Sequence, residues 1–191
     1  MSQSPKIPSI KGQLITCALF CVLALVVTLA FHSPPIFHAW QVGVSIQQQV
    51  AVVVLFAFVV AAGATGVLLI PRLRDAAFRL IPSSLLALEL SAKKALAIAL
   101  CAGVGEELLF RASLQPLLGL WLASAVFAFA HIRTATLVPT TVAKKVIYMS
   151  NIFAVGVGLG LVFQYLGLLT AVLVHSIIDL TALLCLHTLQ S

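Results

Sequence analysis

The stretch GVGEELLFRASLQP, residues 103–116, places three ionisable side chains inside a long run of apolar residues. They are the adjacent carboxylates of Glu106 and Glu107 and the guanidinium of Arg111. An ionised group in hydrocarbon costs about 2.5 kcal/mol or more, so such residues are rare and usually functional. We therefore expect this stretch to carry the chemistry of the protein, and we expect other helices to bring polar groups to it.

The composition indicates an integral membrane protein. Of the 191 residues, 62% are hydrophobic and only 8% are charged, whereas soluble domains carry about 25% charged residues. The strands of a membrane barrel would alternate apolar and polar residues, whereas the apolar runs of this chain are continuous. The sequence therefore predicts an all-α fold: a polytopic transmembrane helical bundle that forms a single domain over residues 1–191.

Six apolar stretches are long enough to be membrane spans. We place them at 13–31, 50–70, 91–115, 117–132, 146–165 and 168–189. Residues 1–12 are expected to be a disordered lead-in, and residues 72–94, interrupted at Pro82, to form an interfacial amphipathic helix.

Single residues mark several of the predicted boundaries. Ser91 is a candidate helix N-cap, and the third span is expected to end near Gln115 and Pro116. A tight link is predicted at Gly167. Glycines 156, 158 and 160 of the fifth span would allow close approach of a neighbouring helix.

The net charge of +6 comes from short basic clusters between the apolar runs. This distribution is typical of membrane topology and speaks against binding of nucleic acid. Placing both termini in the cytoplasm puts ten of the eleven Lys and Arg residues on the cytoplasmic side. We expect an integral protein of a bacterial inner membrane in this orientation, with Glu106 in the outer half of its helix. The four cysteines lie in apolar segments and are interpreted as core residues that form no disulfide.

Glu107 and Arg111 are four residues apart with the acid first, the favourable order for an ion pair on one helical face. Glu106 is rotated about 100° from Glu107, since a helix turns once every 3.6 residues. Arg111 can therefore neutralise Glu107 while Glu106 stays available for chemistry. A purely structural ion pair between Glu107 and Arg111 is the simplest interpretation of these two residues.

Two later spans carry polar pairs with the same spacing: Phe127 and His131, and His175 and Asp179. Imidazole and charged groups from three helices are accommodated best when they face one another. A carboxylate beside a histidine can activate water for attack on a carbonyl, and the resulting oxyanion needs hydrogen-bond donors. Glu106 with His131 fits the first role, and His175 with Asp179 fits the second. Phe127 is interpreted as a packing residue.

Three ordered motifs carry a resemblance to a known family. EELLFR, FAFAH and HSIID are similar to the EExxxR, FxxxH and Hxxx(N/D) motifs of the CPBP family, which comprises type II CAAX prenyl proteases and bacteriocin-processing (Abi) proteins. The resemblance covers about residues 90–185 and implies a glutamate-dependent intramembrane endopeptidase without metal or organic cofactor. It implies water activation by Glu106 and His131, an oxyanion site at His175 and Asp179, and support from Glu107 and Arg111.

The resemblance also implies the partners: the lipid bilayer and a membrane-anchored protein or peptide substrate, such as a prenylated tail, a leader peptide or a sorting helix. One position departs from the best-understood prenyl proteases, which have Asn where this chain has Asp179. An ionised Asp cannot donate a hydrogen bond. Asp179 is therefore either protonated, or it accepts from His175 and orients that ring as the donor.

Two alternatives remain open at this point. His131, His175 and a carboxylate are a possible zinc ligand set, although an HExxH motif is absent. Buried Glu, His and Asp residues also form proton relays, so a non-catalytic immunity or binding protein, or a proton-coupled carrier, is the alternative from another class. The sequence carries no signal for the oligomeric state.

Overall fold

The computed structural model describes residues 10–31, 44–78, 90–132 and 141–190. These residues are helical apart from short turns and caps, so the predicted all-α fold is confirmed. The α-helices are α1 (Ile10–Ala30), α2 (Ile46–Leu69), α3 (Pro71–Phe78), α5 (Ala92–Glu106), α6 (Gln115–Ala130) and α8 (Val142–Gln190), and a π-helix, η2 (Glu107–Leu114), joins α5 to α6.

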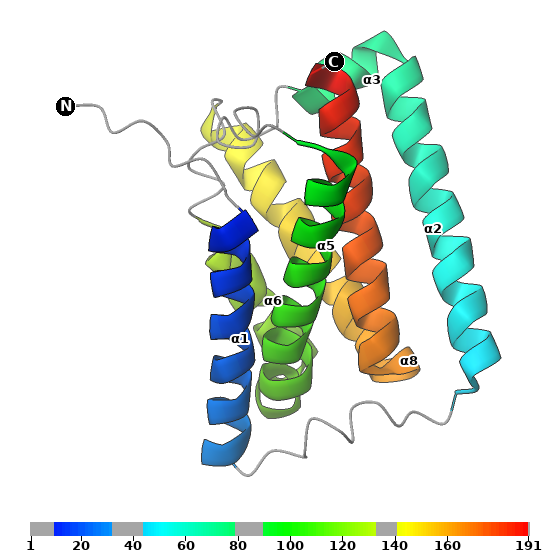
Figure 1. Cartoon of the computed structure of the whole chain (residues 1–191). Helices are drawn as coiled ribbons and strands as arrows, with labels where there is room; N and C mark the ends of the chain where they lie inside the picture. The colour runs from blue at the N-terminus through cyan, green and yellow to red at the C-terminus, as the bar shows by residue number, and fades with distance from the viewer. Residues whose placement is uncertain (1–9, 32–43, 79–89, 133–140, 191) are drawn as a thin grey trace.

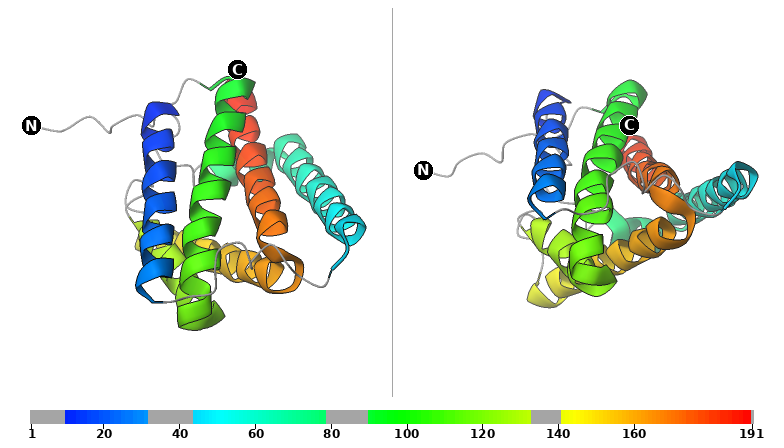
Figure 2. Two further views of the ribbon diagram at one scale, coloured as in Figure 1. Left: turned by 60° about the horizontal axis from the view of Figure 1, so that its bottom comes forward. Right: turned by 90° about the horizontal axis from the view of Figure 1, so that it is seen from below.

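The helices form a bundle around α5, which packs against α1 on one side and α8 on the other (Figure 1). α6 packs against η2 and α8. α2 contacts mainly α8 and α3, and none of its residues is buried. The views in Figure 2 show α2 at the edge of the bundle, diverging from the other helices. The molecule thus has a core of α5, η2, α6 and α8, to which α1 and α2 are added.

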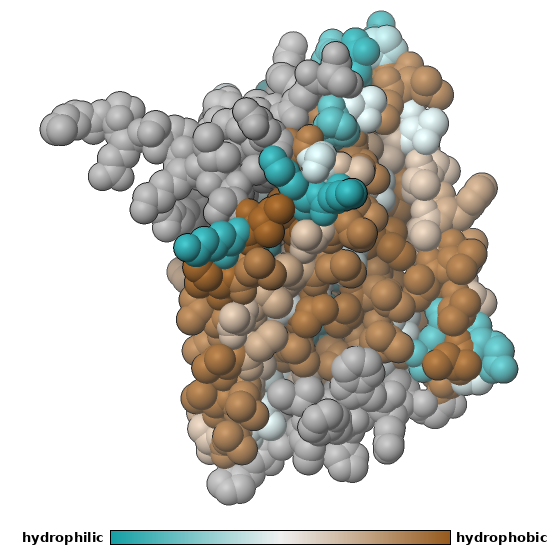
Figure 3. Space-filling model, viewed as in Figure 1, coloured by the Kyte–Doolittle hydropathy of each residue, from teal (hydrophilic) through white to brown (hydrophobic). Residues whose placement is uncertain are grey.

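The surface supports insertion into a bilayer. Five helical stretches are long and apolar enough to cross a membrane: 10–30, 46–69, 92–130, 142–166 and 168–189. The six predicted apolar segments are all helical, and the third and fourth overlap the stretch from 92 to 130, which is interrupted at Gly119. Figure 3 shows polar surface at the two ends of the bundle with a hydrophobic band between them.

Polar caps define where two of the helices begin. Ser91 caps α5 as predicted, because its Oγ accepts a hydrogen bond from the Lys94 backbone N–H at 3.3 Å. At α2, Ser45 and Gln48 form a reciprocal capping box. α2 therefore begins at Ile46, earlier than the predicted Val50, and three glutamines belong to its first turn. α1 likewise begins at Ile10, within the predicted lead-in.

Two glycines with positive φ reverse the chain. Gly167, at φ 86°, makes the predicted link between the two arms of α8. The other turn lies at Gly119, at φ 75°, and the prediction that the helix ends near Pro116 is wrong. Pro116 occupies the first turn of α6, where the missing N–H and the fixed φ of proline are tolerated. Gly119 reverses the chain because only glycine adopts this conformation without steric cost.

The turn at Gly119 makes the second arm of α6 short. Residues 120–130 rise only about 16 Å at 1.5 Å per residue, roughly half of a hydrocarbon core. The fourth predicted span, 117–132, is therefore not a separate crossing within the described residues. The short arm ends at His131, which brings this histidine to the depth of Glu106.

The glycines of the first arm of α8 differ in their surroundings. A Cβ on Gly156 would lie 3.1 Å from Phe127 and 3.3 Å from Ser124, and one on Gly160 would meet Leu120 and Gln115. A Cβ on Gly158 would meet nothing within 4 Å. Close helix approach, predicted for all three, is thus required at Gly156 and Gly160 only.

α1 supports the π-helix through a buried polar contact. The Ser113 Oγ lies 3.1 Å from the Ala24 carbonyl oxygen and 3.0 Å from the Leu108 carbonyl oxygen, either of which can accept its single proton, and 3.3 Å from the Thr28 Oγ1. The edge of the Phe110 ring also packs against Phe20, with centroids 6.0 Å apart. These contacts fix the helix that carries Glu107 and Arg111.

The predicted interfacial helix is described only in part. Residues 71–78 form α3, which lies at the same end of the molecule as the C-terminus (Figure 1). Residues 79–89, including Pro82, lie outside the described residues, as do residues 1–9 of the predicted lead-in.

We predict that Gly103→Ala destabilises the bundle by about 1–3 kcal/mol, the usual range for overpacking. A Cβ at Gly103 would contact Ser176 Oγ and lie 2.9 Å from the Val172 carbonyl oxygen, which forces α8 away from α5. Gly66→Ala is the matched control, since a Cβ there meets nothing within 4 Å. Unfolding in SDS–lipid mixtures measures both variants. Equal stability of the two would show that the α5–α8 contact tolerates a methyl group.

Candidate active site

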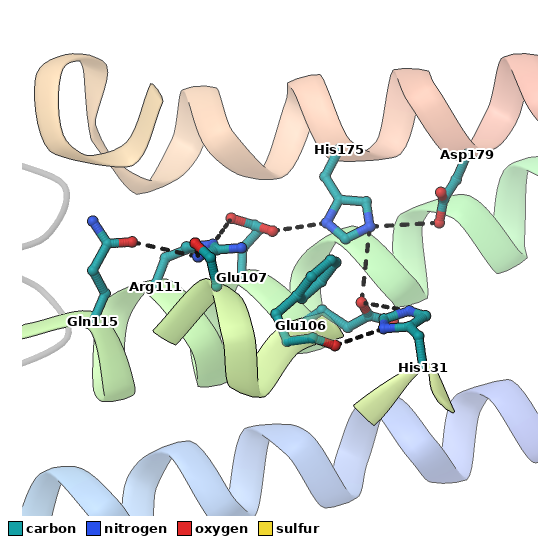
Figure 4. Close-up of polar contacts among 9 residues, drawn as sticks. Glu106, Glu107, Arg111, Gln115, His131, His175 and Asp179 are labelled. Carbon is teal, nitrogen blue, oxygen red and sulfur yellow. Dashed lines mark hydrogen bonds and ion pairs between the residues drawn. The ribbon is translucent and has the colours of Figure 1, made fainter. Parts of the chain in front are cut away.

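The seven residues selected from the sequence all lie in one cluster inside the bundle: six of them are labelled in Figure 4, and Phe127 packs against the two histidine rings. α5 ends at Glu106, and η2 contributes the next two charged residues, Glu107 and Arg111. The other members come from the end of α6 and the second arm of α8: Phe127, His131, His175 and Asp179.

The carboxylate of Glu106 lies between two imidazole rings. Its Oε2 is 3.7 Å from His131 Nε2 and 3.9 Å from His175 Nε2. The Glu106 side chain is 13% exposed, and among the described residues none makes a hydrogen bond to Oε2. Polar atoms at such separations are commonly bridged by water. This oxygen can therefore accept a proton from a small molecule that enters the cluster.

The hydrogen bonds at Nδ1 define the tautomer of each ring. His131 Nδ1 lies 2.9 Å from the Phe127 carbonyl oxygen, which can only accept, so this nitrogen carries the proton. His175 Nδ1 lies 2.7 Å from Glu107 Oε1 and donates to that carboxylate. When the two imidazole rings are neutral, the Nε2 atom of each is therefore unprotonated and faces Glu106.

Glu107 and Arg111 form the predicted pair, with Arg111 Nε 3.5 Å from Glu107 Oε2 and both side chains fully buried. The interpretation of Glu107 as a partner of Arg111 alone was incomplete. Its second oxygen accepts from His175, so one carboxylate connects the guanidinium to the imidazole. Spacing along one helix could not reveal this contact, because His175 belongs to a different helix.

Asp179 lies at the more open side of the cluster. Its side chain is 34% exposed, and its Oδ2 is 3.6 Å from His175 Nε2. This separation exceeds that of a good hydrogen bond but gives strong electrostatic attraction if the ring is charged. The carboxylates of Glu106, Glu107 and Asp179 therefore all face nitrogen atoms of the His175 ring.

Phe127 is the packing residue that the sequence suggested, and it contacts both histidines. Its ring centroid lies 4.7 Å from that of His131 and 6.1 Å from that of His175. The Arg111 guanidinium carbon is 5.2 Å from the same centroid, within cation–π distance. Phe127 is 2% exposed, so it is a buried apolar surface against which the guanidinium and both imidazole rings pack.

Two further polar residues belong to the cluster and were not selected as site residues. Gln115 Oε1 accepts a hydrogen bond from Arg111 Nη1 at 3.5 Å, and Ser124 Oγ accepts from the same nitrogen at 3.4 Å. The sequence held a signal for Gln115, because residues 107, 111 and 115 are spaced four apart. The π-helical winding of residues 107–114 had no recognisable sequence signal, although such segments often occur at functional sites.

The zinc alternative requires three ligands converging on one point. Among the residues that the structure describes, no group of three or more His, Cys, Asp or Glu side chains has an arrangement suited to a metal ion. The cysteines Cys17, Cys21, Cys101 and Cys185 are free thiols. The alternative is tested by the chelation experiment described below.

Fold and site together define a polytopic membrane protein with a carboxylate–histidine centre inside its helical bundle. A comparison with protein-family models matches residues 89–181 to the family described as type II CAAX prenyl endopeptidase Rce1-like. Through this segment the chain belongs to the CAAX-protease (CPBP) family, as its three motifs indicated, and it is in general terms an intramembrane peptide hydrolase. Comparisons with curated proteins and with solved structures found no match.

Proposed function

We propose that this protein hydrolyses a peptide bond of a membrane-anchored protein or peptide with water activated by Glu106 and His131. The observation that carries the proposal is the position of Glu106. Its Oε2 faces the Nε2 atoms of two histidines, while both Nδ1 atoms are held by other acceptors. General-base catalysis requires this kind of positioned and unsatisfied carboxylate.

In the first step, a water donates one hydrogen to Glu106 Oε2 and the other to His131 Nε2. Its oxygen lone pair then points away from both and attacks the substrate carbonyl carbon, as a proton passes to Glu106. The tetrahedral intermediate collapses when the C–N bond breaks and the leaving nitrogen receives that proton from Glu106. The new carboxylic acid then passes the second water proton to the amine, so the products are a carboxylate and an ammonium group, and the site returns to its starting state.

His175 supplies the hydrogen bond to the oxyanion in this proposal. Its Nδ1–H is engaged by Glu107, so its Nε2 can donate only when the ring is an imidazolium. Asp179 stabilises that charge from 3.6 Å. This differs from both roles considered for Asp179, protonation and acceptance of a hydrogen bond from His175, because the carboxylate acts through its charge. It gives an aspartate a function where the related prenyl proteases have asparagine.

The depth of the site bears on the substrate class. Glu106 follows the basic residues Lys93 and Lys94 at the start of α5 by about 20 Å along the helix. The helical path continues from Glu106 through η2 to the turn at Gly119 over a similar length, so the carboxylate lies near the middle of the bundle. With both termini cytoplasmic, as the positive-inside rule favours, the site lies deep within the bilayer. A peptide bond inside the membrane, such as that of a sorting helix, fits this depth better than a cytoplasmic CAAX tail does.

Cysteine labelling tests this orientation. We predict that Gln47→Cys, at the start of α2, reacts with a membrane-impermeant maleimide in intact cells, whereas Arg74→Cys in α3 reacts only after permeabilisation. Both positions are exposed and lie at opposite ends of α2 and α3. The four native cysteines are first replaced by Ala or Ser. The reverse labelling pattern would contradict the positive-inside orientation.

The function itself is tested with purified protein in liposomes. Solubilised membranes from cells that lack the protein are incubated with wild type or Glu106→Gln, with and without a zinc chelator. New peptide termini are identified by mass spectrometry. The proposal predicts termini that depend on Glu106 and resist chelation. Loss of cleavage on chelation and recovery with Zn²⁺ would establish the metal alternative, and absence of any new terminus would support a binding or carrier function.

A further inference from the structure

We propose that Gln115 is a positioning residue for the catalytic centre: it holds Arg111, which holds Glu107, which orients His175. This inference rests on the proposed function for its effect on catalysis, but its structural part can be measured without any substrate. Gln115 lies outside the three motifs and outside the atoms that would touch a substrate.

A continuous series of contacts links the first arm of α8 to its second arm through three side chains. Gln115 Nε2 donates to the Gly160 carbonyl at 3.0 Å, and Gln115 Oε1 accepts from Arg111 Nη1. Arg111 pairs with Glu107, and Glu107 accepts from His175 Nδ1 at 2.7 Å. Figure 4 shows these side chains in sequence, with Gln115 and His175 at opposite ends of the buried ion pair.

A glutamine suits this position because its two hydrogen-bond partners, Gly160 and Arg111, differ in kind. The Gly160 carbonyl can only accept a hydrogen bond, and the guanidinium can only donate one. The amide supplies one donor and one acceptor, and these two partners fix which end faces which. Gln115 is 7% exposed, so an alternative partner from solvent does not compete.

Arg111 depends on Gln115 because its other restraints are few. The contact with Glu107, at 3.5 Å, lacks the geometry of a hydrogen bond. Among the described residues, Gln115 and Ser124 are the hydrogen-bond acceptors that hold the guanidinium. Loss of Gln115 would leave Arg111 restrained by Ser124, by packing on the Phe127 ring and by charge attraction, which is weakly directional. The Glu107 carboxylate would then turn with it and change the His175 ring.

A substitution at Gly160 is an independent way to disturb the same series of contacts. A Cβ at this position would lie 2.7 Å from Gln115 Oε1 and 3.3 Å from Arg111 Nη1, and it would also contact Leu120. Gly160→Ala therefore displaces Gln115 without changing its chemistry. Gly158→Ala is the matched control on the same helix, because its Cβ has open space.

The test combines kinetics with a spectroscopic measurement. Gln115→Met keeps nearly the same volume and removes both hydrogen bonds. The control is Gln49→Met, which removes another glutamine bonded to α8, through the Thr170 hydroxyl at 3.1 Å. Cleavage of a substrate identified as above gives kcat and KM. Protein labelled with ¹⁵N-histidine in lipid gives the His175 Nδ1 signal by solid-state NMR, assigned from its loss in His175→Gln.

We expect Gln115→Met and Gly160→Ala to lower kcat about tenfold, the order expected for a lost hydrogen bond to a charged group, with KM unchanged. Both should shift the His175 Nδ1 signal in the same direction as Glu107→Gln. Both controls should match wild type. A Gln115→Met variant with an unshifted signal would overturn the inference, as would an equal effect of Gln49→Met. If wild type cleaves nothing, the proposed function fails while the NMR signal still decides the positioning role.

Discussion

Replacing Glu106 by Gln is expected to lower the rate of peptide cleavage by about 10³-fold, within the range that a positioned general base contributes. The amide keeps the size of the side chain but cannot take a proton from water. The fold should persist, because Glu106 Oε2 makes no hydrogen bond within the described residues. Single-turnover cleavage in liposomes measures the rate.

The control for this variant is Asp75→Asn, which neutralises an exposed acid on α3 whose side chain is 65% exposed. It should cleave like wild type. The cleavage rate of Glu106→Asp should fall between those of Glu106→Gln and Asp75→Asn, because the shorter side chain withdraws the carboxylate from His131. Wild-type cleavage by Glu106→Gln would remove Glu106 from the mechanism, and the water would need another base.

The second large effect is on stability. We expect Arg111→Met to lower the free energy of unfolding by about 3–5 kcal/mol, the usual cost of removing one partner of a buried ion pair. The Glu107 carboxylate, which is fully buried, would lose its cationic partner, and His175 would lose the fixed position of its acceptor. Unfolding in SDS–lipid mixtures, followed by circular dichroism, measures the difference.

Arg74→Met is the matched control, since Arg74 forms an exposed pair with Asp75 at 3.9 Å. Exposed pairs contribute about 0–1 kcal/mol. The double variant Glu107→Gln/Arg111→Met should lose less than the sum of the two single variants, because neither charge is then left alone. Equal losses for Arg111→Met and Arg74→Met would show that the buried pair does not stabilise the bundle.

The sequence predicted the membrane class, the helical segments and the residues of the cluster for definite physical reasons. Ionisable groups at membrane depth are costly, so Glu106, His131 and His175 were expected to face one another. The four-residue spacing of Glu107 and Arg111 predicted their pairing, and the polar residue before α5 predicted its cap at Ser91. Each of these inferences uses only the local helical period or the cost of burying charge.

The predictions that were wrong, and the contacts that were not predicted, depend on tertiary structure. Pro116 was expected to end a helix, but the chain turns at Gly119, because proline is tolerated in a first turn and glycine alone adopts the required φ. That turn sets the short arm of α6 and the depth of His131. The contact between Glu107 and His175 could not be predicted. Helical periodicity shows which residues share one face of a helix, but it does not show which face of another helix packs against them.

The termini of membrane proteins in the native host show whether this protein cleaves them with Glu106 as the base. Cells expressing wild type and cells expressing Glu106→Gln at the same level are analysed by mass spectrometry of protein ends. We expect a defined set of membrane-anchored proteins to accumulate in longer forms in the mutant. Identical termini in the two strains, with the wild-type phenotype retained by the mutant, would contradict it and would indicate a protein that acts by binding.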